Sequence, residues 1–106
     1  MECQKKVTRT TRRRVRRGKY RSRKTTAFVT NRCVAEVRNV ILRYGRDHKL
    51  PVWDLYVIAG GEGASAKWIA DGLMNPRDHV HCLKSGYELR GALLSDALLK
   101  QLRPTE

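Results

Sequence analysis

The 106-residue sequence predicts a mainly α-helical domain, residues 27–106, preceded by a disordered basic arm, residues 1–26. Two observations lead to this prediction. Positive charge is concentrated in the first 24 residues, which hold twelve Lys or Arg and one acid, Glu2. Apolar residues recur at three- and four-residue spacing only after Ala27, and that period is typical of amphipathic helices. The near-neutral body is long enough to close one small core.

The arm combines high charge with little apolar content. Val7, Val15 and Tyr20 are spread among Thr, Arg and Lys, and so few apolar groups do not offset the entropy cost of ordering the segment. We therefore expect the arm to be disordered when free and to contact nucleic-acid phosphates, because neutralised phosphates release counterions. The residues predicted to bind phosphate are Arg12, Arg13, Arg14, Arg16, Arg17, Lys19, Arg21, Arg23 and Lys24 of the arm and Lys67 of the body. A targeting segment or a solubility tail is the alternative interpretation.

Several classes of protein are excluded by the same inspection. No apolar run approaches the roughly 20 residues needed to cross a bilayer, so no membrane partner is expected. No apolar stretch follows the N-terminal charge, which argues against a secretory signal. Three widely spaced cysteines, an odd number, do not make a disulfide framework and fit a reducing compartment. We expect a cytoplasmic, nucleoid-associated protein, or a nuclear one in a eukaryotic or viral setting.

The first helix is expected at about residues 27–45. Its apolar stripe consists of Cys33, Val34, Val37, Val40, Ile41 and Tyr44. These residues recur at helical spacing, with charged residues between them. Gly45 follows the last of them and is placed to end the helix.

A second apolar block, residues 52–59, begins after Pro51 and ends at Gly60-Gly61. Its β-branched and aromatic content also suits a strand, but its place between two helical segments favours a helix. Ser65 is placed to cap a third helix that contains Trp68 on its apolar face.

A fourth helix is predicted at about residues 76–90. The run Asn75-Pro76-Arg77-Asp78 combines an N-cap residue, a proline suited to the first helical position and an acid in the first turn. Gly91 is placed to stop this helix. Residues 95–106 fit either a short helix or an extended strand, and the sequence leaves both open.

Short helices joined by tight connections, the last one capped at its start, describe a helix-turn-helix unit. In such a unit the third helix of the body supports the fourth, which enters the major groove as the recognition helix. The residues predicted on its outward face are Arg77, Asp78, His81, Lys84 and Ser85. Asp78, His81 and Ser85 would meet base edges, and Arg77 and Lys84 would reach bases or phosphates. An ordinary solvated helix face is the alternative.

Two motifs carry a resemblance to a known family. Ile69-Ala70-Asp71-Gly72-Leu73 and Tyr87-Glu88-Leu89-Arg90-Gly91-Ala92 are similar to the supporting and recognition helices of winged helix-turn-helix regulators of the MarR type. The resemblance covers about residues 50–94 and implies a DNA-binding transcriptional regulator. The family continues with a β-hairpin wing and dimerisation helices, but no hairpin turn signal follows Leu94. This departure from the family pattern predicts a reduced or absent wing, and a homodimer stays open.

No catalytic or metal site is predicted. His79, His81 and Cys82 lack the spacing of a tetrahedral zinc site. No Ser/His/Asp or Cys/His arrangement is supported by local spacing, and Gly60-Gly61-Glu62-Gly63 lacks the Lys-Ser/Thr of a phosphate-binding loop. We therefore expect a protein that is not an enzyme and takes no cofactor.

The leading functional hypothesis is a DNA-binding transcriptional regulator that places a recognition helix in the major groove of duplex DNA and its basic arm on the phosphates. A structural RNA-binding protein with a winged-helix body, part of a ribosomal or other ribonucleoprotein particle, is the alternative, because a basic arm also suits RNA. A third hypothesis is a protein-interaction module.

Overall fold

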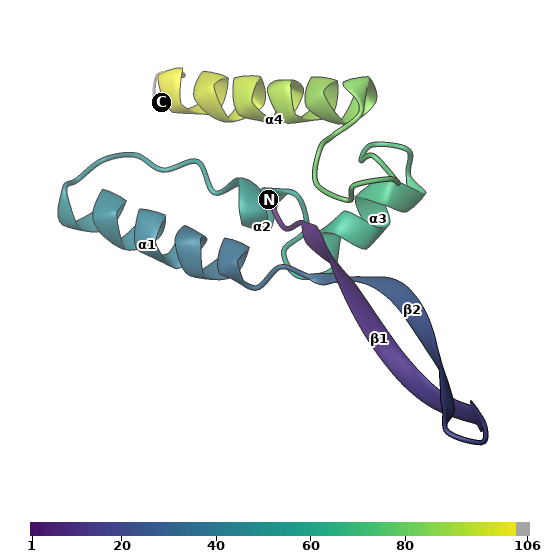
Figure 1. The fold of residues 1–106 in the computed structure, drawn as a ribbon. Coiled ribbons are helices and arrows are strands. Elements are labelled where there is room, and N and C mark those ends of the chain that lie inside the picture. Colours follow the sequence, from purple (N-terminus) through teal and green to yellow (C-terminus); the bar gives the residue numbers. More distant parts are fainter. Residues whose placement is uncertain (104–106) are drawn as a thin grey trace.

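The computed structural model describes residues 1–103 and shows a two-stranded antiparallel hairpin projecting from a small helical body (Figure 1). The elements are β1 (Gln4–Arg16), β2 (Lys19–Thr30), α1 (Cys33–Asp47), α2 (Leu55–Ile58), α3 (Ala64–Ala70) and α4 (Lys84–Leu102). The molecule is elongated, with principal extents of 81 × 32 × 15 Å. With 44% helix and 26% strand it is a mixed α and β structure, so the predicted mainly α-helical fold is wrong.

The basic arm is not a disordered segment but the hairpin itself. β1 and β2 pair from Gln4↔Thr30 to Arg16↔Lys19, with an irregularity between Arg14 and Arg16. Arg17 and Gly18 connect the strands with φ of 28° and 77°. Two successive positive φ values are what a tight hairpin turn of the primed type requires, and Gly18 accepts its value without a Cβ penalty.

The threonines of the arm favour the ordered hairpin, which its charge alone does not predict. The arm contains repeated β-branched Thr, a residue type enriched in strands. The hydroxyl of Thr11 donates to the carbonyl oxygen of Arg23, and that of Thr25 donates to the carbonyl oxygen of Arg9, each at 3.3 Å. The register also places most cationic residues opposite a neutral partner, as in Arg9↔Thr25 and Arg12↔Ser22, which avoids repulsion between like charges.

The first two helices differ in extent from their predictions. Residues 27–30 belong to β2, so α1 starts at Cys33, and it continues past Gly45 to Asp47. Gly45 is buried because Val52 lies against it. The glycine is therefore explained by this close contact, and it does not end the helix. The predicted helix of residues 52–59 is confirmed only as the four-residue α2, which ends before two glycines with positive φ.

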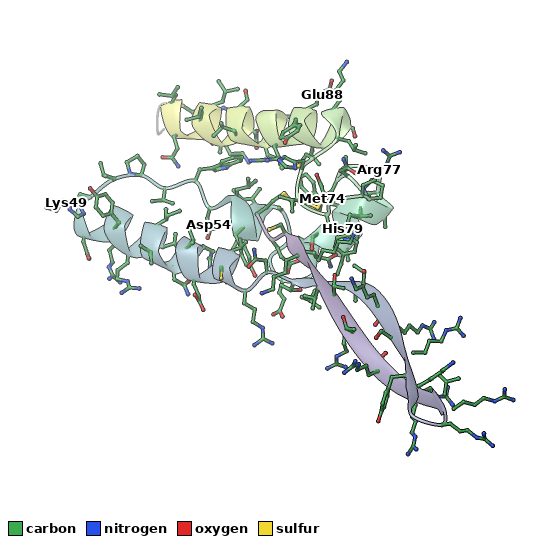
Figure 2. The ribbon with its side chains drawn as sticks, in the orientation of Figure 1. Lys49, Asp54, Met74, Arg77, His79 and Glu88 are labelled. Atoms are coloured by element: carbon green, nitrogen blue, oxygen red, sulfur yellow. The ribbon has the colours of Figure 1, made fainter. Side chains whose placement is uncertain are left out.

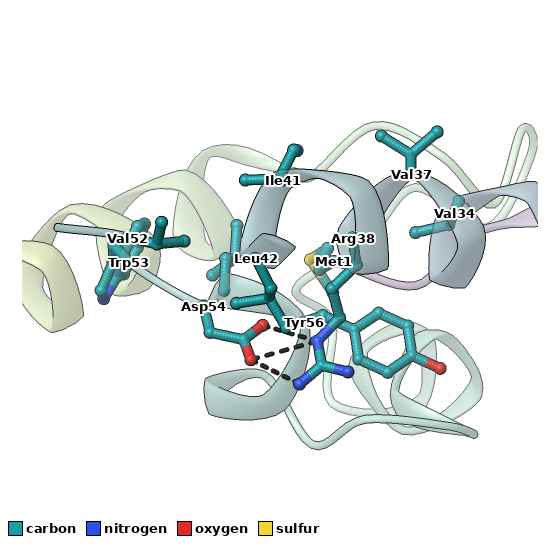
Figure 3. Close-up of a pocket in the computed structure, with 11 residues that line it drawn as sticks. Met1, Val34, Val37, Arg38, Ile41, Leu42, Val52, Trp53, Asp54 and Tyr56 are labelled. Carbon is teal, nitrogen blue, oxygen red and sulfur yellow. Dashed lines mark hydrogen bonds and ion pairs between the residues drawn. The ribbon is translucent and has the colours of Figure 1, made fainter. Parts of the chain in front are cut away.

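An ion pair joins α1 to the start of α2 (Figure 3). The Arg38 guanidinium donates to both carboxylate oxygens of Asp54, with Nη2 2.6 Å from Oδ2 and Nε 2.9 Å from Oδ1. These hydrogen bonds hold the pKa of Asp54 below its usual range. Asp54 also accepts from the Val57 N–H and so caps α2. An apolar cavity of about 190 Å³ adjoins the pair, between α1 and residues 52–56.

The predicted recognition helix at 76–90 is wrong. Asn75 Oδ1 accepts from the Arg77 N–H at 2.8 Å, and Asp78 Oδ1 accepts from the N–H groups of Val80 and His81. These short side chains therefore satisfy local turns instead of capping a helix. α4 begins only at Lys84, does not stop at Gly91 and continues to Leu102. Residues 95–102 are therefore helical and not an extended strand. Residues 104–106 lie outside the described residues.

The core is small and centres on α3. Its buried apolar residues are Ala59, Ala64, Trp68, Met74 and Cys82. The Trp68 indole N–H donates to the carbonyl oxygen of Ala59 at 2.9 Å, which leaves no buried polar atom on that ring unpaired. The loop between α3 and α4 closes over this core through a bridge between Met74 and Cys82.

Glu2 attaches the start of the hairpin to this core. Its side chain is 1% exposed, and its carboxylate accepts from the Gly63 N–H at 2.6 Å, from the Ser65 N–H at 3.2 Å and from the Ser65 hydroxyl. Gly63 is the N-cap of α3, so an anion sits where the helix has free N–H donors and a positive dipole end. A buried carboxylate is thus satisfied without any cationic partner.

A second set of contacts fixes the base of the hairpin. The Gln4 N–H donates to the carbonyl oxygen of His79 at 3.1 Å, and the Asn31 N–H donates to the carbonyl oxygen of Cys3 at 2.9 Å. The His79 ring stacks on Phe28 of β2 with centroids 3.5 Å apart, and its Nδ1 pairs with the Gln4 side chain. His79 thus contacts both strands (Figure 2).

We predict that Glu2→Ala destabilises the protein by about 2–3 kcal/mol, because buried N–H and hydroxyl donors lose their acceptor. Urea unfolding followed by circular dichroism measures the change. Glu62→Ala, an exposed acid in the same loop as Gly63, is the matched control and should change stability by less than about 0.5 kcal/mol. Equal effects of the two substitutions would contradict the anchoring role of Glu2.

Candidate nucleic-acid interface

The hairpin carries almost all of the excess charge of the molecule. Residues 4–30 contain twelve Lys or Arg and no acid, whereas residues 31–106 contain eleven basic and nine acidic residues. Within the described residues, no cationic side chain of the hairpin forms an ion pair. Charge is therefore presented on an ordered ribbon without internal compensation, as Figure 2 shows from its outward-pointing side chains.

The register assigns the basic residues to two faces, because neighbouring residues of a strand point to opposite sides and cross-strand partners share one. We call these the Arg12 face and the Arg13 face. The cationic residues of the Arg12 face are Lys6, Arg12, Arg14 and Lys24. Those of the Arg13 face are Lys5, Arg9, Arg13, Arg21 and Arg23. Arg16, Arg17 and Lys19 lie at the tip.

The Arg13 face is hollowed near the tip. A groove of about 770 Å³ is lined by Thr11, Arg13, Arg14, Val15, Arg21, Ser22 and Arg23. Arg13 and Arg21 are direct cross-strand partners, an arrangement of like charges that costs energy in the free ribbon. An anion in the groove would relieve this repulsion while accepting hydrogen bonds from several guanidinium groups. The groove is therefore the part of the surface best suited to a phosphate.

The Arg12 face differs in chemistry. The Arg12 guanidinium lies over the Tyr20 ring, 5.7 Å from its centroid, so part of its charge is already engaged by an aromatic face. Phe28, farther along this face, is stacked with His79 at the base of the hairpin. This face thus contributes to the internal structure of the hairpin and its anchorage as well as to its charge.

The residues predicted for the recognition helix are dispersed. Arg77, Asp78 and His81 lie in the loop between α3 and α4, whereas Lys84 and Ser85 start α4. The His81 ring pairs with the Asp78 carboxylate at 2.8 Å, and the Ser85 hydroxyl donates to the carbonyl oxygen of Gly72 at 2.8 Å. Most of these polar groups are therefore engaged within the chain and do not form one helical face.

Most of the predicted phosphate-binding residues lie together on the hairpin. Those from Arg12 to Lys24 all lie on the hairpin, and Lys67 lies apart from them on α3. The sequence prediction did not include Lys5, Lys6 and Arg9, which extend the cationic ribbon towards its base. The β-branched residues Val7, Thr8, Thr10 and Thr11 beside them are the signal that could have placed them on a strand.

Within residues 1–103, no group of three or more His, Cys, Asp or Glu side chains is arranged to hold a metal ion. None of the helices in the same range has the length and apolar content needed to cross a membrane.

Comparison with protein-family models, curated proteins and solved structures finds no match for the chain. The resemblance to MarR-type regulators therefore stays a prediction from the sequence.

We predict that Asp78 titrates with a pKa of about 2. The Val80 N–H is the main cause of the lowered pKa, followed by the His81 side chain, since both stabilise the carboxylate. Because its pKa is lower in the folded state, its contribution to stability is complete above the ordinary pKa of about 4 and falls away towards pH 2. Carboxyl NMR titration measures this, and His81→Ala should raise the pKa of Asp78. An unperturbed Asp78 pKa would contradict the turn geometry.

Proposed function

We propose that the chain is a nucleic-acid-binding protein that uses the β1–β2 hairpin as its contact element, with duplex DNA as the first partner. The observation that supports this most strongly is an ordered ribbon that contains twelve cationic residues and no acidic residue. Each phosphate that such a ribbon neutralises releases counterions, which is the main source of affinity in many protein–DNA complexes. The near-neutral body offers no comparable charge.

The shape of the hairpin suits a groove of duplex DNA. The major groove is about 12 Å wide and admits a two-stranded β-ribbon, and strands serve as the reading element in several classes of DNA-binding protein. Arg, Thr and Ser side chains, which dominate the ribbon, can meet phosphates and base edges. The hairpin therefore takes the place that the sequence assigned to a recognition helix. A regulatory or accessory role at the nucleoid, or in a nucleus, follows from this proposal.

The proposal assigns the phosphate contacts to the groove on the Arg13 face. The triple variant Arg13→Gln/Arg21→Gln/Arg23→Gln should weaken duplex binding about 10- to 100-fold and reduce the slope of log K against log salt by about 2–3, since each lost phosphate contact contributes about 0.9. The matched control Lys6→Gln/Arg12→Gln/Lys24→Gln removes the same charge from the Arg12 face and should have a clearly smaller effect. Fluorescence anisotropy at several salt concentrations measures both.

A structural RNA-binding role is a second candidate, because cationic residues occur on both faces and at the tip of the ribbon. A polyanion that surrounds the hairpin would use all of them, and folded RNA offers such enclosures. Competition between a DNA duplex and a folded RNA of equal length, at two salt concentrations, separates the candidates. Equal losses in the two triple variants together with a preference for RNA would replace the DNA proposal. Absence of salt-dependent binding to either would refute both.

A further inference from the structure

One face of α1 carries an apolar seam whose side chains are largely exposed. Cys33, Val37, Val40 and Tyr44 follow one another at spacings of four, three and four residues. This is the repeat by which two helices pack together, with Cys33 and Val40 at position d of a heptad and Val37 and Tyr44 at position a. Val37, Val40 and Tyr44 are 56%, 58% and 56% exposed.

The seam lies beside the part of α1 that contacts the body, because Val37 and Ile41 also line the cavity between α1 and residues 52–56. In Figure 3 Val37 and Ile41 point away from the Arg38–Asp54 ion pair. Ile41 is 51% exposed and widens the seam. An apolar groove of about 350 Å³ lies beside the seam, between the second half of α1 and the segment 50–52, and is lined by Val40, Ile41, Tyr44, Gly45, Leu50, Pro51 and Val52.

The area left exposed exceeds that of a compact monomer. The chain exposes 8971 Å², whereas a folded monomer of this mass exposes about 6,000 Å². The solvated hairpin accounts for part of the difference, and the uncovered helix faces add to it. A stable interface buries about 800 Å² on each partner, which is less than the difference between these two areas.

The charges beside the seam fit a second copy of α1 in antiparallel orientation. Antiparallel helices pack position a of one against position d of the other, which sets Val37 against Val40 of the second copy and Cys33 against its Tyr44. In that register Glu36 lies beside Arg43 of the second copy, and the same pair forms again by symmetry. Opposite charges at these flanking positions set partner choice and orientation.

Other registers bring like charges together. A shift by one heptad in one direction places Glu36 beside Glu36 of the second copy, and a shift in the other direction places Arg43 beside Arg43 of the second copy. Repulsion between like charges disfavours both arrangements. Parallel pairing would place two hairpins of twelve positive charges side by side. Antiparallel pairing separates the hairpin bases by about the length of a 15-residue α1, roughly 22 Å, well beyond the Debye length of about 8 Å.

We propose that this face of α1 binds a second copy of the chain, forming an antiparallel two-fold dimer. Along the helix, the two-fold axis lies at the level between Arg38 and Asn39. The dimer closes on itself, because the same surface serves both partners. Its near-neutral bodies meet while the cationic hairpins project from opposite ends. This proposal does not depend on nucleic-acid binding by the hairpin.

Charge exchange tests the register. Sedimentation equilibrium of the full chain should give twice the monomer mass of 12.2 kDa. Glu36→Arg and Arg43→Glu should each weaken the dimer at least 10-fold, since each creates two like-charge contacts. The double variant Glu36→Arg/Arg43→Glu should restore it, because the opposite charges face each other again. A double variant weaker than both single variants would overturn the proposed register.

A second pair of variants tests the seam. Val40→Asp should yield a folded monomer by circular dichroism, whereas Asn39→Asp, on an exposed position away from the seam, should leave the dimer intact. A native chain that stays monomeric at 100 µM overturns the proposal. Neutral phosphatidylcholine vesicles should not bind the native chain; a monomer whose vesicle binding is abolished by Val40→Asp would instead assign the face to a lipid surface.

Discussion

The buried carboxylate of Glu2 is the contact on which the arrangement of the molecule depends. It occupies the N-terminus of α3, which supplies two backbone N–H groups and a hydroxyl, and it is only two residues from the start of β1. A two-stranded hairpin alone is marginally stable in water. Because Glu2 and the stacked pair of His79 and Phe28 tie both strands to the core, the hairpin leaves the body in a defined direction. An anchored base converts a cationic segment into a ribbon with two distinct faces.

The sequence anticipated the positions of α1 and α3 from their apolar faces, which for α3 includes Trp68. The expected Ser65 cap of α3 is wrong, because the helix begins at Ala64 with Gly63 as its N-cap. It misplaced α4, since Asn75 and Asp78 have the same local preference for a helix cap and for a turn, and only the tertiary structure decides between them. The prediction for the arm is wrong for a different reason. Its charge density predicts disorder, but its threonines and the turn at Arg17-Gly18 favour a hairpin.

The candidate site could be predicted in composition but not in geometry. The residues from Arg12 to Lys24 were identified by charge alone. Their division into faces depends on the pairing register, which the two-residue turn at Arg17-Gly18 sets, and on the irregularity between Arg14 and Arg16; the prediction of a disordered arm included neither. The groove formed by Arg13, Arg21 and Arg23 therefore had no signal in the sequence. The separation of an ordered cationic ribbon from a near-neutral body with an apolar seam explains how one chain of this charge could bind a polyanion and still associate with itself.

Amide hydrogen exchange of the free protein, read residue by residue, tests the central claim that the hairpin is an ordered element anchored to the core. The account predicts protection of the paired β1 and β2 amides, strongest near Gln4 and Thr30 at the base, decreasing towards Arg17 and Gly18. It also predicts that Glu2→Ala lowers protection along the whole hairpin. Exchange at unfolded-chain rates throughout residues 4–30 of the native protein would contradict the account.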